Sequence, residues 1–164
     1  MGDEPMTVAA LPPTAQRVQA LLRESGSDCT VRMLAATARS AADAAAAIGC
    51  TVAQIAKSLV FRSAGGRAVL VIASGTNRVD EGKIAAALGE TIGKADADFV
   101  RDRTGYAIGG VAPVGHPPGI RIFIDADLAK YDAIWAAAGH PHAVFRLTAE
   151  ELVRLTKGTV IPIA

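Results

Sequence analysis

The 164-residue chain is 51% hydrophobic and 20% charged, proportions that exclude an intrinsically disordered protein and suit one domain with a substantial core. Its 17 lysines and arginines against 16 acidic residues leave a net charge of +1. This balance excludes a globally basic surface, so nucleic acid would have to bind through a local patch, and DNA is not an expected partner.

Residues 1–13 are expected to form a flexible N-terminal arm. They include Pro5, Pro12 and Pro13, and they lack the basic segment followed by an apolar core that marks a secretory signal. No run in the chain approaches the roughly 20 apolar residues of a membrane span. The sequence therefore predicts a soluble, cytoplasmic protein without a membrane partner, whose folded domain covers residues 14–164.

Hydrophobic periodicity and capping signals predict helices and strands in an irregular order. Helices are expected where apolar residues recur on one face between a capping residue, such as Ser40 or Asp80, and a glycine. They are also expected at the capping boxes TVAQ (51–54) and TAEE (148–151). The predicted helical segments are 14–26, 40–49, 51–54, 79–89, 95–105 and 148–156. Short apolar runs predict strands at 29–35, 57–62, 67–74, 120–126, 133–139, 143–148 and 158–164.

Two pairs of the predicted strands are hairpins. Residues 57–62 and 67–74 flank a Gly-Gly turn, and residues 133–139 and 143–148 flank a His-Pro-His turn. The run 67–74 is apolar nearly throughout, which predicts a strand covered on both faces. Strands and helices do not alternate regularly, so a doubly wound parallel sheet is not expected. The predicted fold is α/β of the α+β type: a single compact domain with a curved, mixed, mostly antiparallel sheet surrounded by helices.

The segment YAIGGVAPVGHP (residues 106–117) is rich in glycine and proline and carries no fixed charge. It contains the glycine spacing of a phosphate-binding P-loop, but His-Pro stands where Lys and Ser or Thr are needed, and Pro113 removes a backbone donor. The P-loop is therefore excluded. Two interpretations remain: a tight connection, or a stiff wall in which the N–H groups of Gly109, Gly110 and Val111 face a small polar group.

Lys57 lies in the segment QIAKSLVF, at the start of the first hairpin strand. Strand alternation places it on the same face as Leu59 and Phe61, with Ser58, Val60 and Arg62 on the other face. A lysine on an apolar face is either a strand-end side chain that reaches solvent or a functional ammonium group that lines a pocket.

Metal-dependent and nucleophilic catalysis are poorly supported. His140 and His142 flank a proline and would need a further ligand, such as His116 or Asp125, while no established metal-binding motif is present. No serine lies in a G-x-S-x-G sequence, and both cysteines lie in apolar surroundings without an adjacent base. Neither a metal nor another cofactor is expected.

Taken together, these segments resemble the YbaK/ProX family of aminoacyl-tRNA deacylases, which also occur as the editing insertion of bacterial prolyl-tRNA synthetases. The most specific feature is a lysine in an AKSLVF-like strand combined with a G-x-x-x-P loop. The resemblance extends over about residues 14–164 and keeps the family's order. The matching segments are QIAKSLVF (54–61), the helix 80–89, TGYAIGGVAPVG (104–115), IRIFIDADL (120–128), AIWAAAG (133–139) and ELVRLTKGTVIPI (151–163).

The resemblance implies a free-standing, trans-editing deacylase that hydrolyses the ester of a mischarged aminoacyl-tRNA. It assigns the catalytic role to Lys57. It assigns substrate binding to Ser58 and to the loop residues Gly109, Gly110, Val111, Ala112 and Pro113.

The resemblance also limits the expected substrate. Walls of glycine, alanine and proline make a small, stiff pocket that excludes large side chains. Ser58 stands where alanine-specific members carry asparagine, so the amino acid stays open among alanine, cysteine, serine and threonine. The expected tRNA is tRNA(Pro), with prolyl-tRNA synthetase as a candidate partner. The alternative function is a non-catalytic tRNA- or synthetase-associated binding module on the same fold.

Overall fold

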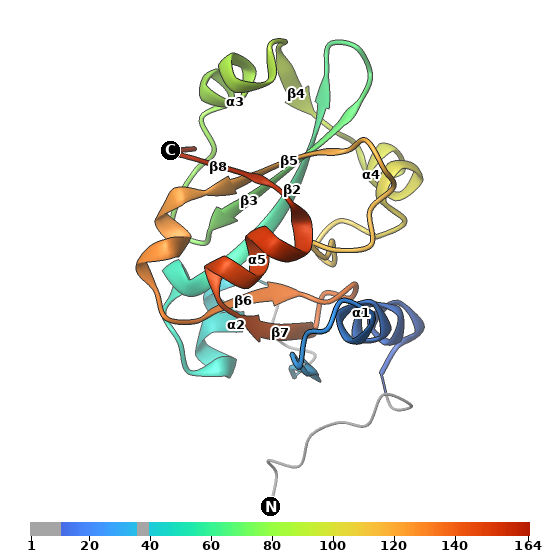
Figure 1. Ribbon diagram of the computed structural model, residues 1–164, viewed down its shortest axis with the longest axis vertical. Helices are drawn as coiled ribbons and strands as arrows, with labels where there is room; N and C mark the ends of the chain where they lie inside the picture. Colours follow the sequence, from blue (N-terminus) through green and yellow to red (C-terminus); the bar gives the residue numbers. More distant parts are fainter. Residues whose placement is uncertain (1–10, 36–39) are drawn as a thin grey trace, which may run out of the picture.

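The computed structural model describes residues 11–35 and 40–164 (Figure 1). Its α-helices are α1 (Pro13–Glu24), α2 (Ala41–Ile48), α3 (Glu81–Leu88), α4 (Ala97–Thr104) and α5 (Ala149–Thr156), and its 3₁₀ helices include η2 (Val52–Gln54) and η3 (Ala126–Lys130). Its strands are β1 (Val31–Met33), β2 (Ile55–Ser63), β3 (Ala68–Ser74), β4 (Ile92–Lys94), β5 (Arg121–Asp125), β6 (Ile134–Ala137), β7 (Ala143–Leu147) and β8 (Thr159–Ile161). Within these residues, no helix has both the length and the apolar character required to cross a membrane.

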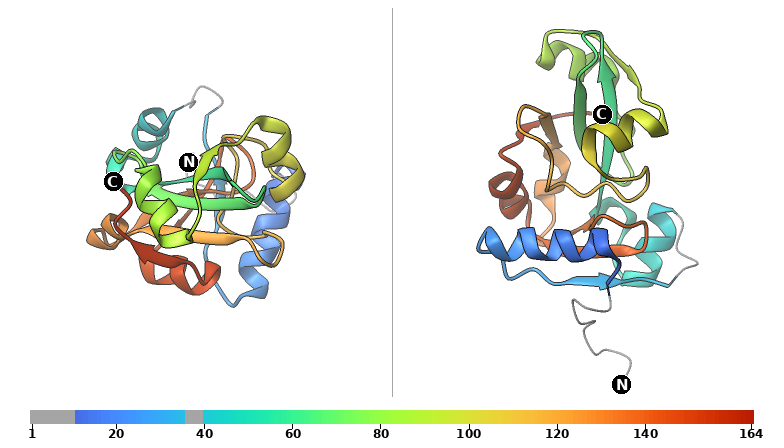
Figure 2. Two further views of the ribbon diagram at one scale, coloured as in Figure 1. Left: turned by 90° about the horizontal axis from the view of Figure 1, so that it is seen from above. Right: turned by 90° about the vertical axis from the view of Figure 1, so that its right-hand side faces the viewer.

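One mixed sheet contains the eight described strands, in the order β1-β7-β6-β2-β3-β5-β8, with β4 beside β2. The pairs β1–β7, β6–β7, β2–β3 and β2–β4 are antiparallel, whereas β2–β6, β3–β5 and β5–β8 are parallel. At one end of the sheet, β1 and β7 run in a different direction from the β2–β3 hairpin. The sheet is therefore curved (Figure 2). The predicted fold class, a single α+β domain with a mixed sheet, is confirmed.

Apolar side chains are buried on both faces of the β2–β3 hairpin. In β3, Leu70 and Ile72 belong to the larger core cluster, which also contains residues of α1, α4 and α5. Val69, Val71 and Ala73 belong to a second cluster, which contains a residue of α3. The prediction that this strand is covered on both faces is confirmed, because strand alternation sends its side chains into two separate clusters.

The predicted helix caps are confirmed where the sequence marked them. Ser40, Asp80 and Thr148 each accept a hydrogen bond from a backbone N–H in the first turn of α2, α3 and α5 respectively. Thr51 and Gln54 form the predicted capping box, but the helix that follows is a single 3₁₀ turn. Local side-chain chemistry thus determines where most of the helices begin.

Two features differ from the sequence-based expectation. Leu11 is buried in the core and Pro13 is the first residue of α1, so the folded domain extends beyond the predicted boundary at residue 14. The remainder of the predicted arm, residues 1–10, lies outside the described residues. Strand β4 was not predicted, because Ile92–Lys94 contains a single apolar side chain and no apolar run, and only pairing with β2 defines the strand.

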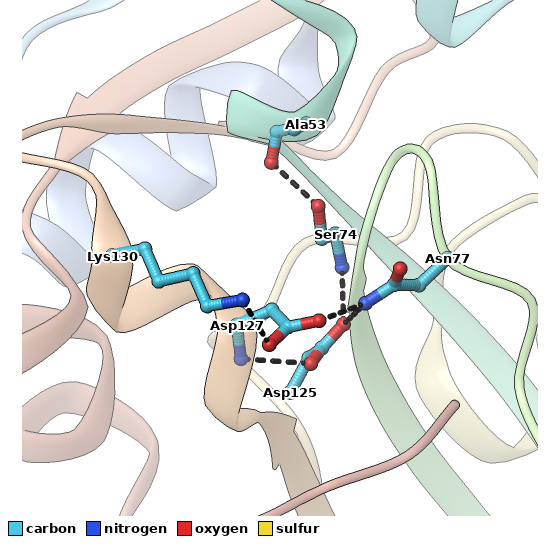
Figure 3. Close-up of polar contacts among 6 residues, drawn as sticks. All are labelled: Ala53, Ser74, Asn77, Asp125, Asp127 and Lys130. Atoms are coloured by element: carbon cyan, nitrogen blue, oxygen red, sulfur yellow. Dashed lines mark hydrogen bonds and ion pairs between the residues drawn. The ribbon is translucent and has the colours of Figure 1, made fainter.

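A buried carboxylate at the end of β5 connects three segments of the chain (Figure 3). Asp125 is 2% exposed. Its Oδ2 accepts hydrogen bonds from the N–H of Ser74 at 3.0 Å and from Nδ2 of Asn77 at 2.8 Å, and its Oδ1 accepts from the N–H of Asp127 at 2.9 Å. Ser74 in turn donates its hydroxyl to the carbonyl of Ala53 at 2.6 Å. These bonds hold η2, the turn that leads into β2.

Replacing Asp125 with alanine is expected to destabilise the protein by about 3 kcal/mol, because buried N–H donors lose their acceptor. Urea unfolding at neutral pH measures the change. Asp127→Ala is the comparison, since Asp127 is partly exposed and its carboxylate contacts the side chains of Asn77 and the exposed Lys130 without accepting a buried backbone N–H. Asp127→Ala should lose clearly less stability, and equal losses would contradict the central role of the buried carboxylate.

Candidate active site

Strand β2 is paired along the whole of one edge but only at the two ends of the other. Strand β3 pairs with residues 56–62 on the first edge. On the second edge, β6 pairs with Ile55 and Ala56, and β4 pairs with residues 61–63. No described strand pairs with residues 57–60 on that edge, which leaves an opening in the sheet.

A cavity of about 660 Å³ lies at this opening, within the size range of small-molecule sites. Most of its lining is apolar and comes from α2, β2, β6, β7 and the glycine loop. Besides residues of β2, the lining includes Ser40, Ala44, Lys94, Trp135, His142 and Val144.

Lys57 and Ser58 both line this cavity. Alternation places them on opposite faces of β2, and both reach the cavity because it opens at the edge of the strand. Lys57 is half-buried, and no carboxylate of the described residues lies within 4.0 Å of its ammonium group. The Ser58 hydroxyl oxygen is buried and lacks a hydrogen-bond partner in the described part of the chain. A charge and a free hydroxyl in an apolar cavity are suited to binding the polar groups of a ligand.

The glycine loop forms another wall of the cavity. Gly109 and Val111 line the cavity. The other residues of the predicted motif are buried but do not line it: Gly110, Ala112 and Pro113. The N–H of Gly110 donates to the carbonyl of Ala107 at 3.0 Å. The expectation that Gly110 offers its N–H to a ligand is therefore wrong, because the turn itself uses this donor.

Side chains outside the G-x-x-x-P motif hold the backbone of the loop. The Tyr106 hydroxyl donates to the carbonyl of Val114 at 2.6 Å, and Arg17 of α1 donates from Nη2 to the carbonyl of Gly115 at 3.1 Å. The Arg17 guanidinium also lies over the Tyr106 ring, 5.9 Å from its centroid. The cavity wall is thus fixed to a helix 98 residues away in the sequence.

The His116 side chain forms a hydrogen bond with the backbone of the glycine loop. Its Nε2 lies 2.6 Å from the carbonyl oxygen of Ala112, and since a carbonyl only accepts, Nε2 carries the proton. Burial lowers the pKa of the His116 imidazole, although the hydrogen bond to Ala112 opposes this effect, so the ring is neutral at pH 7. Its Nδ1 is buried and has no partner among the described residues. The geometry gives His116 a structural role in shaping the loop.

The loop also packs closely against the turn between β6 and β7. A Cβ atom at Gly110 would lie 3.0 Å from the Cα of His140, closer than well-packed atoms come. Gly109 has a φ of +90°, in the region that favours glycine. The two glycines are therefore required for different reasons. Gly110 permits the loop to approach the β6–β7 turn closely, and Gly109 permits the positive φ of the loop itself.

Sequence reasoning missed part of the cavity lining. The missed residues are Ser40, which caps α2, Ala41 and Ala44 of α2, Trp135 of β6 and Val144 of β7. Each lies in a segment with an ordinary helix or strand pattern. Such a pattern shows which residues share a face, but it does not show which distant segment covers that face.

The histidines do not gather around one point. The His116 ring packs against that of Tyr106, with centroids 5.6 Å apart, whereas His140 and His142 pack against each other at 5.5 Å. Asp125 belongs to the network of Figure 3. The constellation of histidines and Asp125 that the sequence left open for a metal is therefore not formed.

In the described part of the chain, the group that could hold a metal ion is Asp28, Cys29 and Glu151, whose ligand atoms lie within 4.8 Å of one another. This group lines a separate hollow that contains neither Lys57 nor the glycine loop. Cys29 lies 3.7 Å from the Glu151 carboxylate, a neighbour that its apolar segment did not predict. Burial raises the pKa of the Cys29 thiol, and Glu151 adds to this effect, so the thiol is protonated at neutral pH.

Comparison with known proteins identifies the family. Residues 35–155 match the aminoacyl-tRNA editing domain. The chain belongs to this family. The editing domain is 32% identical over 109 residues to the protein YwhH of Bacillus subtilis (strain 168), an alignment that covers 66% of this chain and 69% of YwhH.

Solved structures share the fold of this editing domain. A protein proposed to be a trans-editing enzyme for prolyl-tRNA synthetase superimposes with a TM-score of 0.89 at 44% identity, covering 94% of this chain and 98% of that one. The protein APE2540 superimposes with a TM-score of 0.83 at 26% identity, covering 90% and 98%. The predicted membership of the YbaK-like deacylase family is confirmed.

Family membership defines the class of reaction. An aminoacyl-tRNA editing domain is a hydrolase that cleaves the ester between an amino acid and the terminal ribose of tRNA. Aminoacyl-tRNA is thus the substrate class, and the prediction of a deacylase is confirmed. The roles of individual residues, including Lys57, stay predictions.

Gly110→Ala is expected to destabilise the editing domain by about 1–3 kcal/mol, because the added methyl group would force the loop away from the β6–β7 turn. Gly93→Ala is the matched control, since a Cβ atom at this position of β4 would meet nothing within 4 Å. Chemical unfolding of both variants measures the difference. Similar losses in the two variants would argue against close packing at Gly110.

Proposed function

We propose that this protein acts in trans as an editing deacylase that removes a small amino acid, such as alanine, cysteine, serine or threonine, from mischarged tRNA(Pro). The proposal is supported by one cavity, whose lining includes Lys57, Ser58, Gly109 and Val111. The similar protein proposed to edit for prolyl-tRNA synthetase supports the choice of tRNA. Prolyl-tRNA synthetase is a candidate partner, and the cytoplasm, where translation uses aminoacyl-tRNA, is the proposed place of action.

Lys57 supplies positive charge to the reaction. Attack on an aminoacyl ester places negative charge on the carbonyl oxygen, and an ammonium group in a mostly apolar cavity stabilises this charge better than it would in water. The N–H groups of Gly109 and Val111 donate to no other described group, and they are the candidate backbone donors to the same oxygen. Positioning and electrostatics therefore provide the proposed rate enhancement.

The proposed nucleophile is a water molecule or a group of the substrate itself, such as the ribose hydroxyl or the thiol of a cysteinyl ester. Ser58 is the nearest hydroxyl in sequence to Lys57, but its oxygen has no hydrogen-bond partner among the described residues and hence no base to activate it. Its role in the proposal is recognition. In a mostly apolar cavity, this hydroxyl binds a polar group of the aminoacyl moiety, such as the hydroxyl of serine or threonine.

Lys57→Ala is expected to lower kcat/KM for deacylation of a mischarged tRNA by about 10²–10³-fold, the usual effect of losing one charge-stabilising group. The assay measures release of amino acid from tRNA(Pro) charged with alanine, cysteine, serine or threonine. Lys57→Arg keeps the charge and should retain part of the activity. Lys83→Ala, on α3 and away from the cavity, should behave like the wild type.

Full activity of Lys57→Ala would remove Lys57 from the mechanism. If the wild type binds tRNA but releases none of the four amino acids, the function is that of a non-catalytic binding module.

Ser58→Ala is expected to change the ranking of substrates. The ratio of kcat/KM for seryl- to alanyl-tRNA(Pro) should fall by about tenfold or more, because a polar contact to the seryl side chain is lost while the methyl group of alanine is unaffected. The two substrates are measured in parallel, so a general loss of folded protein cancels in the ratio. An unchanged ratio would contradict a recognition role for this hydroxyl.

A further inference from the structure

Two arginines from different elements lie over one aromatic ring. The guanidinium carbon of Arg62, on β2, is 5.2 Å from the centroid of the Phe99 ring, and that of Arg103, on α4, is 4.8 Å from it. Phe99 is 9% exposed, whereas both arginines are exposed. The ring therefore acts as a platform that holds two positive charges close to each other.

Neither guanidinium forms an ion pair with a carboxylate of the described residues. The ion pair recorded among the described residues joins Lys130 to Asp127, on η3. Asp98 and Asp102 of α4 are exposed, but neither lies within 4.0 Å of either arginine. Two cations that share a ring repel each other, and an anion bound between them removes this repulsion. Guanidinium groups match the oxygen geometry of a phosphate group in particular.

The position of this pair relative to the candidate active site indicates which phosphate it meets. Arg62 follows Lys57 by five residues on the same strand, a separation of about 16 Å between their Cα atoms at about 3.3 Å per residue. This odd offset places Arg62 on the opposite face of β2 from Lys57, the face of Ser58, which also lines the cavity. Lys94, opposite Phe61 on β4, lines the cavity and lies between the two. A distance of about 16 Å is the length of about four or five stacked nucleotides, if each adds about 3.4 Å as in one strand of B-DNA.

We propose that Arg62 and Arg103, held on Phe99, bind the phosphodiester backbone of the acceptor strand a few nucleotides from the aminoacylated ribose, with Lys94 between them and the cavity. This inference rests on the proposed function, because it takes aminoacyl-tRNA as the ligand. Contacts to phosphate orient the RNA without reading its bases. The pair of arginines therefore contributes to binding of the whole tRNA and leaves the chemistry at the ester unchanged.

The test uses the double variant Arg62→Gln/Arg103→Gln, which removes both charges but keeps part of each side-chain stem on the ring. Arg121→Gln is the matched control: Arg121 also lies over a phenylalanine ring, 5.0 Å from the centroid of Phe123, but among the described residues no second arginine shares that ring. Three measurements are compared: affinity for uncharged tRNA(Pro) as a function of salt, deacylation of aminoacyl-tRNA, and deacylation of an aminoacyl ester of adenosine.

The double variant is expected to bind tRNA about tenfold more weakly and to reduce the slope of log K against log salt by about 1 to 2. KM for aminoacyl-tRNA should rise by a similar factor with kcat unchanged, while hydrolysis of the adenosine ester and all properties of Arg121→Gln should match the wild type. Unchanged tRNA affinity and salt slope would overturn the inference while leaving the deacylase function intact. An equal loss on the adenosine ester would also overturn it, because the arginines would then act through the structure of the site.

If the wild type hydrolyses neither substrate, the proposed function fails on its own. The tRNA-binding measurements still decide whether the arginine pair contacts RNA.

Discussion

The incomplete pairing of β2 determines where this protein can bind a ligand. Strand β3 holds β2 along residues 56–62, but on the other edge β6 and β4 hold only its two ends. The backbone between them lies at the edge of a cavity and not under another strand. Open strand edges are normally covered or blunted by charge, and here Lys57 stands at the opening. The feature that interrupts the sheet therefore also creates the candidate active site.

Buried hydrogen bonds fix the walls of this cavity before any substrate arrives. The Asp125 carboxylate holds the turn that precedes β2, through Ser74 and the carbonyl of Ala53. On the opposite wall, Tyr106 and His116 bind carbonyl groups of the glycine loop. The proposed reaction uses no protein nucleophile, so it depends on groups that are already in place when charge develops on the ester. A rigid loop and a rigid strand meet that requirement.

Charge is distributed locally in a chain whose net charge is only +1. Lys57 faces the cavity, and Arg62 and Arg103 share the ring of Phe99 further along β2. Because both Lys57 and Arg62 belong to one strand, their separation is set by strand geometry and changes little. Such an arrangement suits a ligand with a reactive end and a charged backbone. A near-neutral composition therefore remains compatible with a nucleic-acid partner.

Local structure and family membership could both be predicted from the amino-acid sequence. Capping residues such as Ser40 and Asp80 marked helix starts, and the apolar run of β3 indicated a strand covered on both faces. The lysine strand and the glycine loop identified an editing domain. Only the tertiary structure decided that Trp135 and α2 complete the cavity and that the Gly110 N–H is consumed by its own turn. The physical reason is that periodicity and capping act over a few residues, whereas a cavity is enclosed by segments that only long-range packing brings together.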